Sequence, residues 1–112
     1  MIRLLIVDDE RLEREGVKYL LSQENKEWRI YEAANGKDAL QILREEKIDL
    51  LLTDIKMPHM DGLELTSKAK ELYPELPVVI FSGYSDFAFA QEAMRYGVTE
   101  YVLKPVDPEE FH

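Results

Sequence analysis

The sequence predicts one α/β domain, built on a parallel β-sheet with helices on both faces. Five short apolar segments recur along the 112 residues, and stretches with helical apolar spacing lie between them. The third of these segments is apolar except near its ends, which is typical of a central strand that is buried on both faces. The length fits a single domain with a single core.

The expected strands alternate with the expected helices in a regular order. The strands are expected at residues 2–7, 28–33, 48–53, 78–82 and 100–103. Four apolar stripes mark the helices: Leu12, Val17, Leu20 and Leu21; Ala39, Leu40 and Leu43; Leu65, Ala69 and Leu72; Ala90, Ala93 and Met94. Asn35-Gly36 is expected to begin the second helix, Pro74 to stop the third and Gly97 to end the fourth.

Composition excludes several classes of protein. The hydrophobic fraction of 46% is that of a globular chain, and the net charge of -9 opposes direct binding to nucleic acid. The absence of cysteine excludes disulfides, thiol catalysis and cysteine metal sites. No apolar run approaches the ~18 residues of a membrane span, and a first strand that starts at Ile2 leaves no room for a signal peptide. We therefore expect a cytoplasmic protein that contacts no membrane.

Carboxylates follow two of the expected strands directly. The first strand runs into Asp8-Asp9, and the third runs into Asp54. If these strands are parallel neighbours, their carboxyl ends bring the three carboxylates together at one edge of the sheet. The carboxylates of such a cluster repel one another unless a cation lies among them, and a set of oxygen ligands favours Mg²⁺ over zinc.

A hydroxyl and an ammonium group follow the remaining central and edge strands. Ser82 ends the fourth expected strand, and Lys104-Pro105 follows the fifth. A metal, a cation and a positioned nucleophile are the parts that phosphoryl transfer requires. The sequence has no glycine-rich nucleotide loop, so we expect the phosphate to arrive on a small donor or on another protein.

These motifs together resemble the receiver domain of bacterial two-component response regulators, over essentially the whole chain. The residues that carry the resemblance are Asp8-Asp9, Asp54, Lys56-Met57-Pro58, Asp61-Gly62, Ser82-Gly83, Tyr101 and Lys104-Pro105. Residues 82–87 and 104–107 are similar to receivers that precede AraC-type DNA-binding domains. The resemblance implies a flavodoxin-like (CheY-like), doubly wound sheet of five strands in the order 2-1-3-4-5.

The resemblance also implies a function and partners. It implies a regulatory domain, not an enzyme, that assists its own phosphorylation and dephosphorylation. A sensor histidine kinase would supply the phosphoryl group. An output domain outside this chain, expected to bind DNA and regulate transcription, would receive the signal. We expect one receiver domain over residues 1–112, with a final helix that Asp107-Pro108 opens and that is cut short.

The role of each site residue follows from the same resemblance. Asp54 would be the phosphoacceptor and a ligand of Mg²⁺. Asp9 would bind the metal directly, Asp8 mostly through water, and Lys56 through its backbone carbonyl.

On the other side of the site, Ser82 and Lys104 would each hold a phosphoryl oxygen. Tyr101 would report the phosphorylated state by changing rotamer, and the peptide bond before Pro105 would be cis.

Other interpretations of these residues and of the function remain open at this point. Asp9 could be only a helix cap. A metal-dependent phosphatase also uses an aspartate nucleophile at a strand end, but Lys56 stands where its second carboxylate is expected. A flavin-binding module would need a phosphate-cradling loop after the first strand, where this chain is acidic. A receiver that signals without phosphorylation is the last alternative. Met57-Pro58 is interpreted as a brace for the loop.

The fourth expected helix carries more apolar surface than one stripe. Phe87 and Met94 lie along one flank, and Phe89 and Tyr96 along the other. Both flanks could be buried under neighbouring elements. Alternatively, one flank forms a surface for an effector or for a homodimer through the face of the fourth helix and fifth strand.

Overall fold

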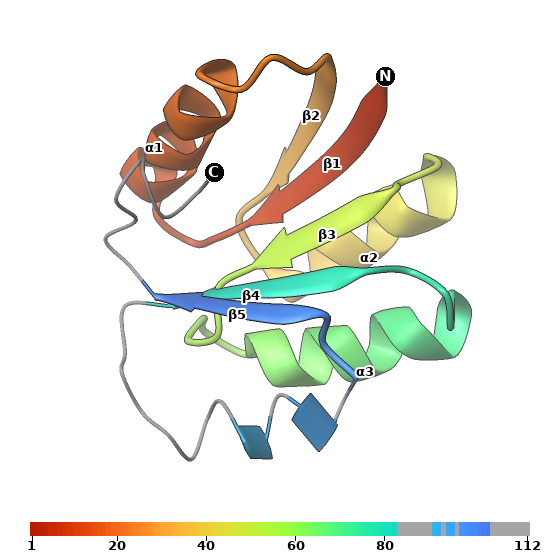
Figure 1. The fold of residues 1–112 in the computed structure, drawn as a ribbon. Helices are drawn as coiled ribbons and strands as arrows, with labels where there is room; N and C mark the ends of the chain where they lie inside the picture. Colours follow the sequence, from red (N-terminus) through yellow and green to blue (C-terminus); the bar gives the residue numbers. More distant parts are fainter. Residues whose placement is uncertain (83–90, 93, 96, 104–112) are drawn as a thin grey trace.

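The computed structural model describes residues 1–82, 91, 92, 94, 95 and 97–103. Figure 1 shows a five-stranded parallel sheet in the order β2-β1-β3-β4-β5, which confirms the predicted topology. The strands are β1 Ile2–Val7, β2 Trp28–Ala33, β3 Leu50–Thr53, β4 Val78–Ser82 and β5 Glu100–Leu103. The helices are α1 Arg11–Ser22, α2 Gly36–Glu45 and α3 Gly62–Leu72. Residues 91, 92, 94 and 95 are also helical.

Helices cover both faces of the sheet, as predicted. Helices α2 and α3 pack on one face, and α1 packs on the other (Figure 1). Successive residues of β1 therefore enter different layers of the core: Leu5 and Val7 pack with α2 and α3, whereas Leu4 and Ile6 pack with α1. This double burial explains why the central strands are continuous apolar runs.

The helix boundaries follow local capping chemistry. The Asn35 side chain accepts a hydrogen bond from the Asp38 amide at 2.7 Å and caps α2. Helix α3 ends at Leu72, before Pro74, and Gly97 has a φ of 80°, a conformation that suits glycine at a helix end. These ends were predicted. No helix in the described part of the chain is long and apolar enough to cross a bilayer.

Three sequence expectations need correction. Strand β3 begins at Leu50 and not at residue 48, because the Asp49 carboxylate accepts a hydrogen bond from the Arg3 amide at 2.9 Å and so competes with the strand ladder. Two members of the predicted apolar stripes are not core residues: Leu12, in the first turn of α1, is 84% exposed, and Leu72, the last residue of α3, is 42% exposed. Met94 is 61% exposed, so its flank is not buried at that position. The other flank residues of the fourth helix, Phe87, Phe89 and Tyr96, lie outside the described residues.

Gly16 lies on the exposed side of α1 and offers a test of the helix energetics. A Cβ atom built there would meet no atom within 4 Å. Replacing Gly16 by alanine is therefore expected to stabilise the chain by about 0.5–1 kcal/mol, because glycine loses more backbone entropy in a helix. Urea unfolding followed by circular dichroism measures this, and a lower midpoint in Gly16→Ala would contradict the placement.

Candidate functional site

The strand register places two of the predicted aspartates side by side. Val7 of β1 pairs with Thr53 of β3, and each is the last residue of its strand. The Asp54 amide then donates to the Val7 carbonyl at 2.9 Å, and the Asp8 amide donates to the carbonyl of Ala33 at 3.1 Å. Asp8 and Asp54 therefore continue the two ladders by one residue and leave the sheet at the same edge.

Asp8, Asp9 and Asp54 form a compact acidic cluster at this edge. One carboxylate oxygen from each lies within 4.8 Å of the others. Asp8 is buried, with 4% of its surface exposed, Asp54 is half-buried, and Asp9 is exposed, so the cluster runs from the interior to the surface. Neighbouring carboxylates repel one another, and a hard cation relieves that repulsion. The all-oxygen donor set fits Mg²⁺.

Main-chain amides orient the inner two carboxylates. Asp8 Oδ1 accepts from the Glu10 amide at 2.9 Å, and Asp54 Oδ1 accepts from the Ile55 amide at 2.8 Å. Glu10 is the N-cap of α1 and makes no side-chain capping hydrogen bond. The alternative interpretation of Asp9 as a helix cap is therefore wrong.

The loop after Asp54 is packed closely against its main chain. The Asp54 carbonyl accepts from the buried Thr53 hydroxyl at 2.9 Å, and the Gly62 amide donates to the Ile55 carbonyl at 2.7 Å. A Cβ atom on Gly62 would overlap the Asp54 carbonyl oxygen and lie 2.9 Å from the Ile55 Cα. Glycine is thus required at position 62, because the main chain there lies too close to that of Asp54, the phosphoacceptor candidate, to leave room for a side chain. Sequence reasoning gave Gly62 no such role and named Asp61-Gly62 only among the residues that carry the family resemblance. Asp61 caps α3 by accepting from the Glu64 amide at 2.8 Å.

Apolar side chains brace the same loop. Ile55 and Met57 are buried in the core with residues of α2 and α3, which agrees with the interpretation of Met57 as a brace, whereas Pro58 is exposed. Lys56, between them, is exposed. His59 has a φ of 71°, in the left-handed region that favours glycine, a feature that sequence reasoning did not identify.

The remaining predicted residues are placed only in part. The backbone of Ser82 pairs with Leu103 at the end of β4, and that of Tyr101 pairs with Ile80 within β5. The side chains of Ser82 and Tyr101 lie outside the description, as do Lys104 and Pro105 entirely. Their predicted roles, including the cis peptide bond, stay predictions.

A charged network borders the acidic cluster on the side of α1. Glu32, on the edge strand β2, accepts from Arg14 Nε at 3.1 Å and from Lys18 Nζ at 3.0 Å. Hydrogen bonds with Glu15 and then Glu32 raise the pKa of Lys18. Partial burial acts to raise the pKa of Glu32, but the hydrogen bonds from Lys18 and Arg14 outweigh it, and the pKa is lowered.

The lowered pKa of Glu32 predicts a pH-dependent contribution to stability. Because the charged form is favoured in the fold, the contribution is present above the ordinary value of 4.5 and is lost as the pH falls through the folded value. Glu32→Gln is expected to lower the free energy of unfolding by about 0.2–1 kcal/mol at neutral pH, because the Glu32 side chain is 32% exposed and solvent still screens its ion pairs. Urea midpoints of both proteins should converge below pH 4.5. A difference that grew on acidification would contradict the assignment.

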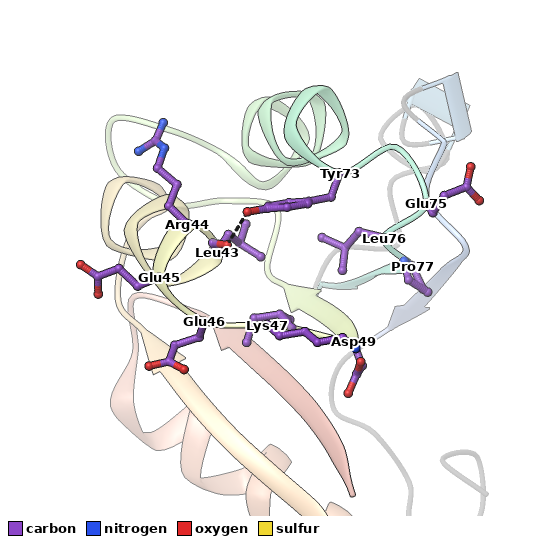
Figure 2. A pocket seen from close by; sticks show the side chains of 11 residues that line it. Leu43, Arg44, Glu45, Glu46, Lys47, Asp49, Tyr73, Glu75, Leu76 and Pro77 are labelled. Carbon is purple, nitrogen blue, oxygen red and sulfur yellow. Dashed lines mark hydrogen bonds between the residues drawn. The ribbon is translucent and has the colours of Figure 1, made fainter.

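A pocket lies at the end of the sheet opposite to the acidic cluster. Figure 2 shows this pocket of about 630 Å³, lined by residues that precede β3 and β4, with the Tyr73 hydroxyl donating to the Leu43 carbonyl at 2.8 Å. The acidic cluster follows the carboxyl ends of the strands, so the two lie at opposite edges. The pocket is therefore not part of the acidic site.

Comparison with known proteins places the chain in a family. The model of the response regulator receiver domain matches residues 4–112. The uncharacterized transcriptional regulatory protein YesN of Bacillus subtilis is 35% identical across 98% of this chain. The transcriptional regulatory protein HptR of Staphylococcus aureus is 35% identical across 96% of it. A crystal structure of a two component transcriptional regulator AraC from Clostridium phytofermentans matches with a TM-score of 0.83 and 38% identity, covering 99% of this chain and 86% of that one.

The chain is therefore a regulatory domain of two-component signalling, and it belongs to the response regulator receiver family. The predicted CheY-like fold is confirmed by the solved structures it resembles, among them the chemotaxis protein CheY4 of Vibrio cholerae, with a TM-score of 0.89 and 26% identity. The chain spans only 30% of YesN and 42% of HptR, so these relatives are much longer than this receiver.

Proposed function

We propose that this domain is a phosphorylation-controlled signalling switch in which Asp54 accepts a phosphoryl group with the help of Mg²⁺. The observation that carries the proposal is the convergence of three carboxylates within 4.8 Å at the carboxyl ends of β1 and β3. Without a cation, the half-buried Asp54 carboxylate is repelled by the two carboxylates beside it. With a bound metal, it is well placed to share that metal with an incoming phosphoryl group.

Each site residue has a distinct part in this proposal. Exposed Asp9 would bind Mg²⁺ directly, buried Asp8 mostly through water, and Lys56 through its carbonyl. When bound, the metal offsets the negative charge of the carboxylates and of the phosphoryl oxygens. The Ile55 amide, which donates to Asp54 Oδ1, fixes the nucleophile in its orientation. Ser82 and Lys104 would hold the phosphoryl oxygens.

The partners follow from the family and from the length of the relatives. We propose that a sensor histidine kinase supplies the phosphoryl group and that a DNA-binding output domain outside this chain receives the signal. YesN and HptR are both named as transcriptional regulators, and the similar structure from Clostridium phytofermentans is an AraC regulator. A homodimer through the face of the fourth helix and β5 would be one way to transmit the change.

Phosphorylation by a small donor tests the central claim. With acetyl phosphate and Mg²⁺, intact-mass analysis should reveal one added phosphoryl group, and chelation of the metal should prevent the addition. Hydroxylamine should remove the group, because it cleaves an acyl phosphate and leaves a phosphoserine intact. A chain that gains no mass, or gains a hydroxylamine-resistant group, would overturn the proposal.

Two substitutions distinguish a side-chain ligand of the metal from a main-chain ligand. Asp9→Ala removes a carboxylate and is expected to weaken Mg²⁺ binding by at least about tenfold, since outer-shell changes alone reach that size. Lys56→Ala keeps the main-chain carbonyl and should bind the metal nearly as well as the parent. Calorimetric titration measures both affinities. Equal losses in the two variants would contradict the division of roles.

We also propose how phosphorylation would reach the surface. Ser82 would donate to a phosphoryl oxygen and draw its loop toward Asp54, and Tyr101 would swing inward to fill the space left behind. Amide shifts of residues 91–95 with and without beryllofluoride, a phosphoryl mimic, test this relay. If Ser82→Ala binds the mimic and moves those shifts as far as the parent does, the relay is wrong.

A further inference from the structure

Arg14 is the residue that connects the charged network on α1 to the acidic cluster. Its Nη1 atom donates to the Asp8 main-chain carbonyl at 2.7 Å, while its Nε atom pairs with Glu32 Oε1 at 3.1 Å. Long side chains on a helix extend toward its N-terminal end, which is how Arg14 reaches back to the start of the β1–α1 loop. One guanidinium thus joins the helix, the edge strand β2 and the first aspartate of the cluster.

The position of Glu32 explains why Arg14 is held in place. Glu32 is in register with Ile6, whose side chain packs on the α1 face of the sheet. Glu32 therefore faces α1 from the edge strand and accepts from both cations of the network. The Arg14 side chain is only 15% exposed, against 31% for Lys18, so its geometry is the more constrained of the two.

Arg14 contacts Asp8 at a residue whose main chain and side chain are both held by hydrogen bonds. The Asp8 carbonyl is bonded to Arg14, and the Asp8 carboxylate is bonded to the Glu10 amide at 2.9 Å. Main chain and side chain of the same residue are therefore both tied down. Fixed outer groups of this kind set the direction of metal ligands, and their loss weakens metal binding.

We propose that Arg14 is a positioning residue that, anchored by Glu32, holds the Asp8 main chain so that the Asp8 and Asp9 carboxylates converge on Asp54. Its positive charge by itself repels a bound cation, so a loss of Mg²⁺ affinity on removal of Arg14 would report its positioning role and not its charge. The inference rests on the proposed magnesium site, but it concerns a residue that would not touch the metal.

Two charge-matched substitutions test the proposal. Arg14→Met and Lys18→Met each remove one positive charge and one partner of Glu32, but only Arg14 contacts Asp8. Calorimetry with MgCl₂ is expected to give a dissociation constant about tenfold higher for Arg14→Met and within about twofold of the parent for Lys18→Met. Arg14→Lys keeps the charge without the guanidinium fork, so its affinity should stay closer to that of Arg14→Met than to that of the parent.

A second readout needs no metal. In the metal-free protein, the Glu10 amide should exchange with deuterium faster in Arg14→Met than in the parent, and at the parental rate in Lys18→Met. Urea unfolding identifies conditions in which all variants are folded. Equal magnesium affinity and Glu10 exchange in Arg14→Met and the parent would overturn the inference, as would equal losses in Arg14→Met and Lys18→Met or full rescue by lysine. A parent chain that binds no Mg²⁺ would instead refute the proposed function, and the exchange measurement would still decide the role of Arg14.

Discussion

Replacing Asp54 by alanine is expected to abolish the uptake of a phosphoryl group from acetyl phosphate. The substitution removes the proposed acceptor and one of the three carboxylates that lie within 4.8 Å of one another. No other carboxylate of the cluster is equivalent: Asp8 is buried, and Asp9 is at the exposed end. Intact-mass analysis in the presence of Mg²⁺ should therefore find only the unmodified chain.

The fold itself should tolerate this change. Asp54→Ala loses the hydrogen bond from the Ile55 amide, which contributes about 0.5–1.5 kcal/mol, but it also relieves repulsion within the cluster. We expect the two effects to offset each other to within about 1 kcal/mol in the absence of metal. Asp49→Ala is a matched control, because Asp49 lies at the opposite end of β3 and binds the Arg3 amide. This control should be phosphorylated normally, and phosphorylation that persisted in Asp54→Ala would refute the assignment of the acceptor.

The acidic cluster could be predicted because it depends on the ends of strands. Apolar runs that stop at Asp8 and Asp54 fix both the strand ends and the edge of the sheet where they meet, once the strands are taken as parallel neighbours. The same reasoning failed for Leu12, because helical spacing alone does not reveal which members of an apolar stripe are buried against the sheet. It also placed the start of β3 too early, because Asp49 offers the backbone of Arg3 a competing acceptor.

The supporting residues of the site could not be predicted in the same way. Arg14 acts through the direction of its side chain, and Gly62 through the close approach of the start of α3 to the main chain after β3. Neither depends on the apolar pattern. The contact of Arg14 with Asp8 spans six residues, and it becomes visible only when α1 is placed against β1. Sequence spacing thus identifies the groups that do the chemistry more readily than those that hold them in position.

Replacing Gly62 by alanine is expected to damage both the fold and the site. The added Cβ atom would overlap the Asp54 carbonyl oxygen and crowd the Ile55 Cα, and both are main-chain atoms that cannot rotate away. Overpacking of this kind costs about 1–3 kcal/mol. Because the Gly62 amide also donates to the Ile55 carbonyl at 2.7 Å and ties the start of α3 to this loop, relief would require Asp54 or the helix to shift.

Gly36→Ala separates this specific clash from a general effect of adding a methyl group. Gly36 is also the first residue of its helix, but the three atoms nearest to an added Cβ there all belong to the side chain of Met60, which is flexible and can move. We expect Gly36→Ala to change stability by less than about 1 kcal/mol and to leave phosphorylation intact. Gly62→Ala should lower the urea midpoint and slow phosphorylation of Asp54 even at temperatures where the variant remains folded. If the two variants behave alike in both measurements, the close approach of Gly62 does not control the position of Asp54.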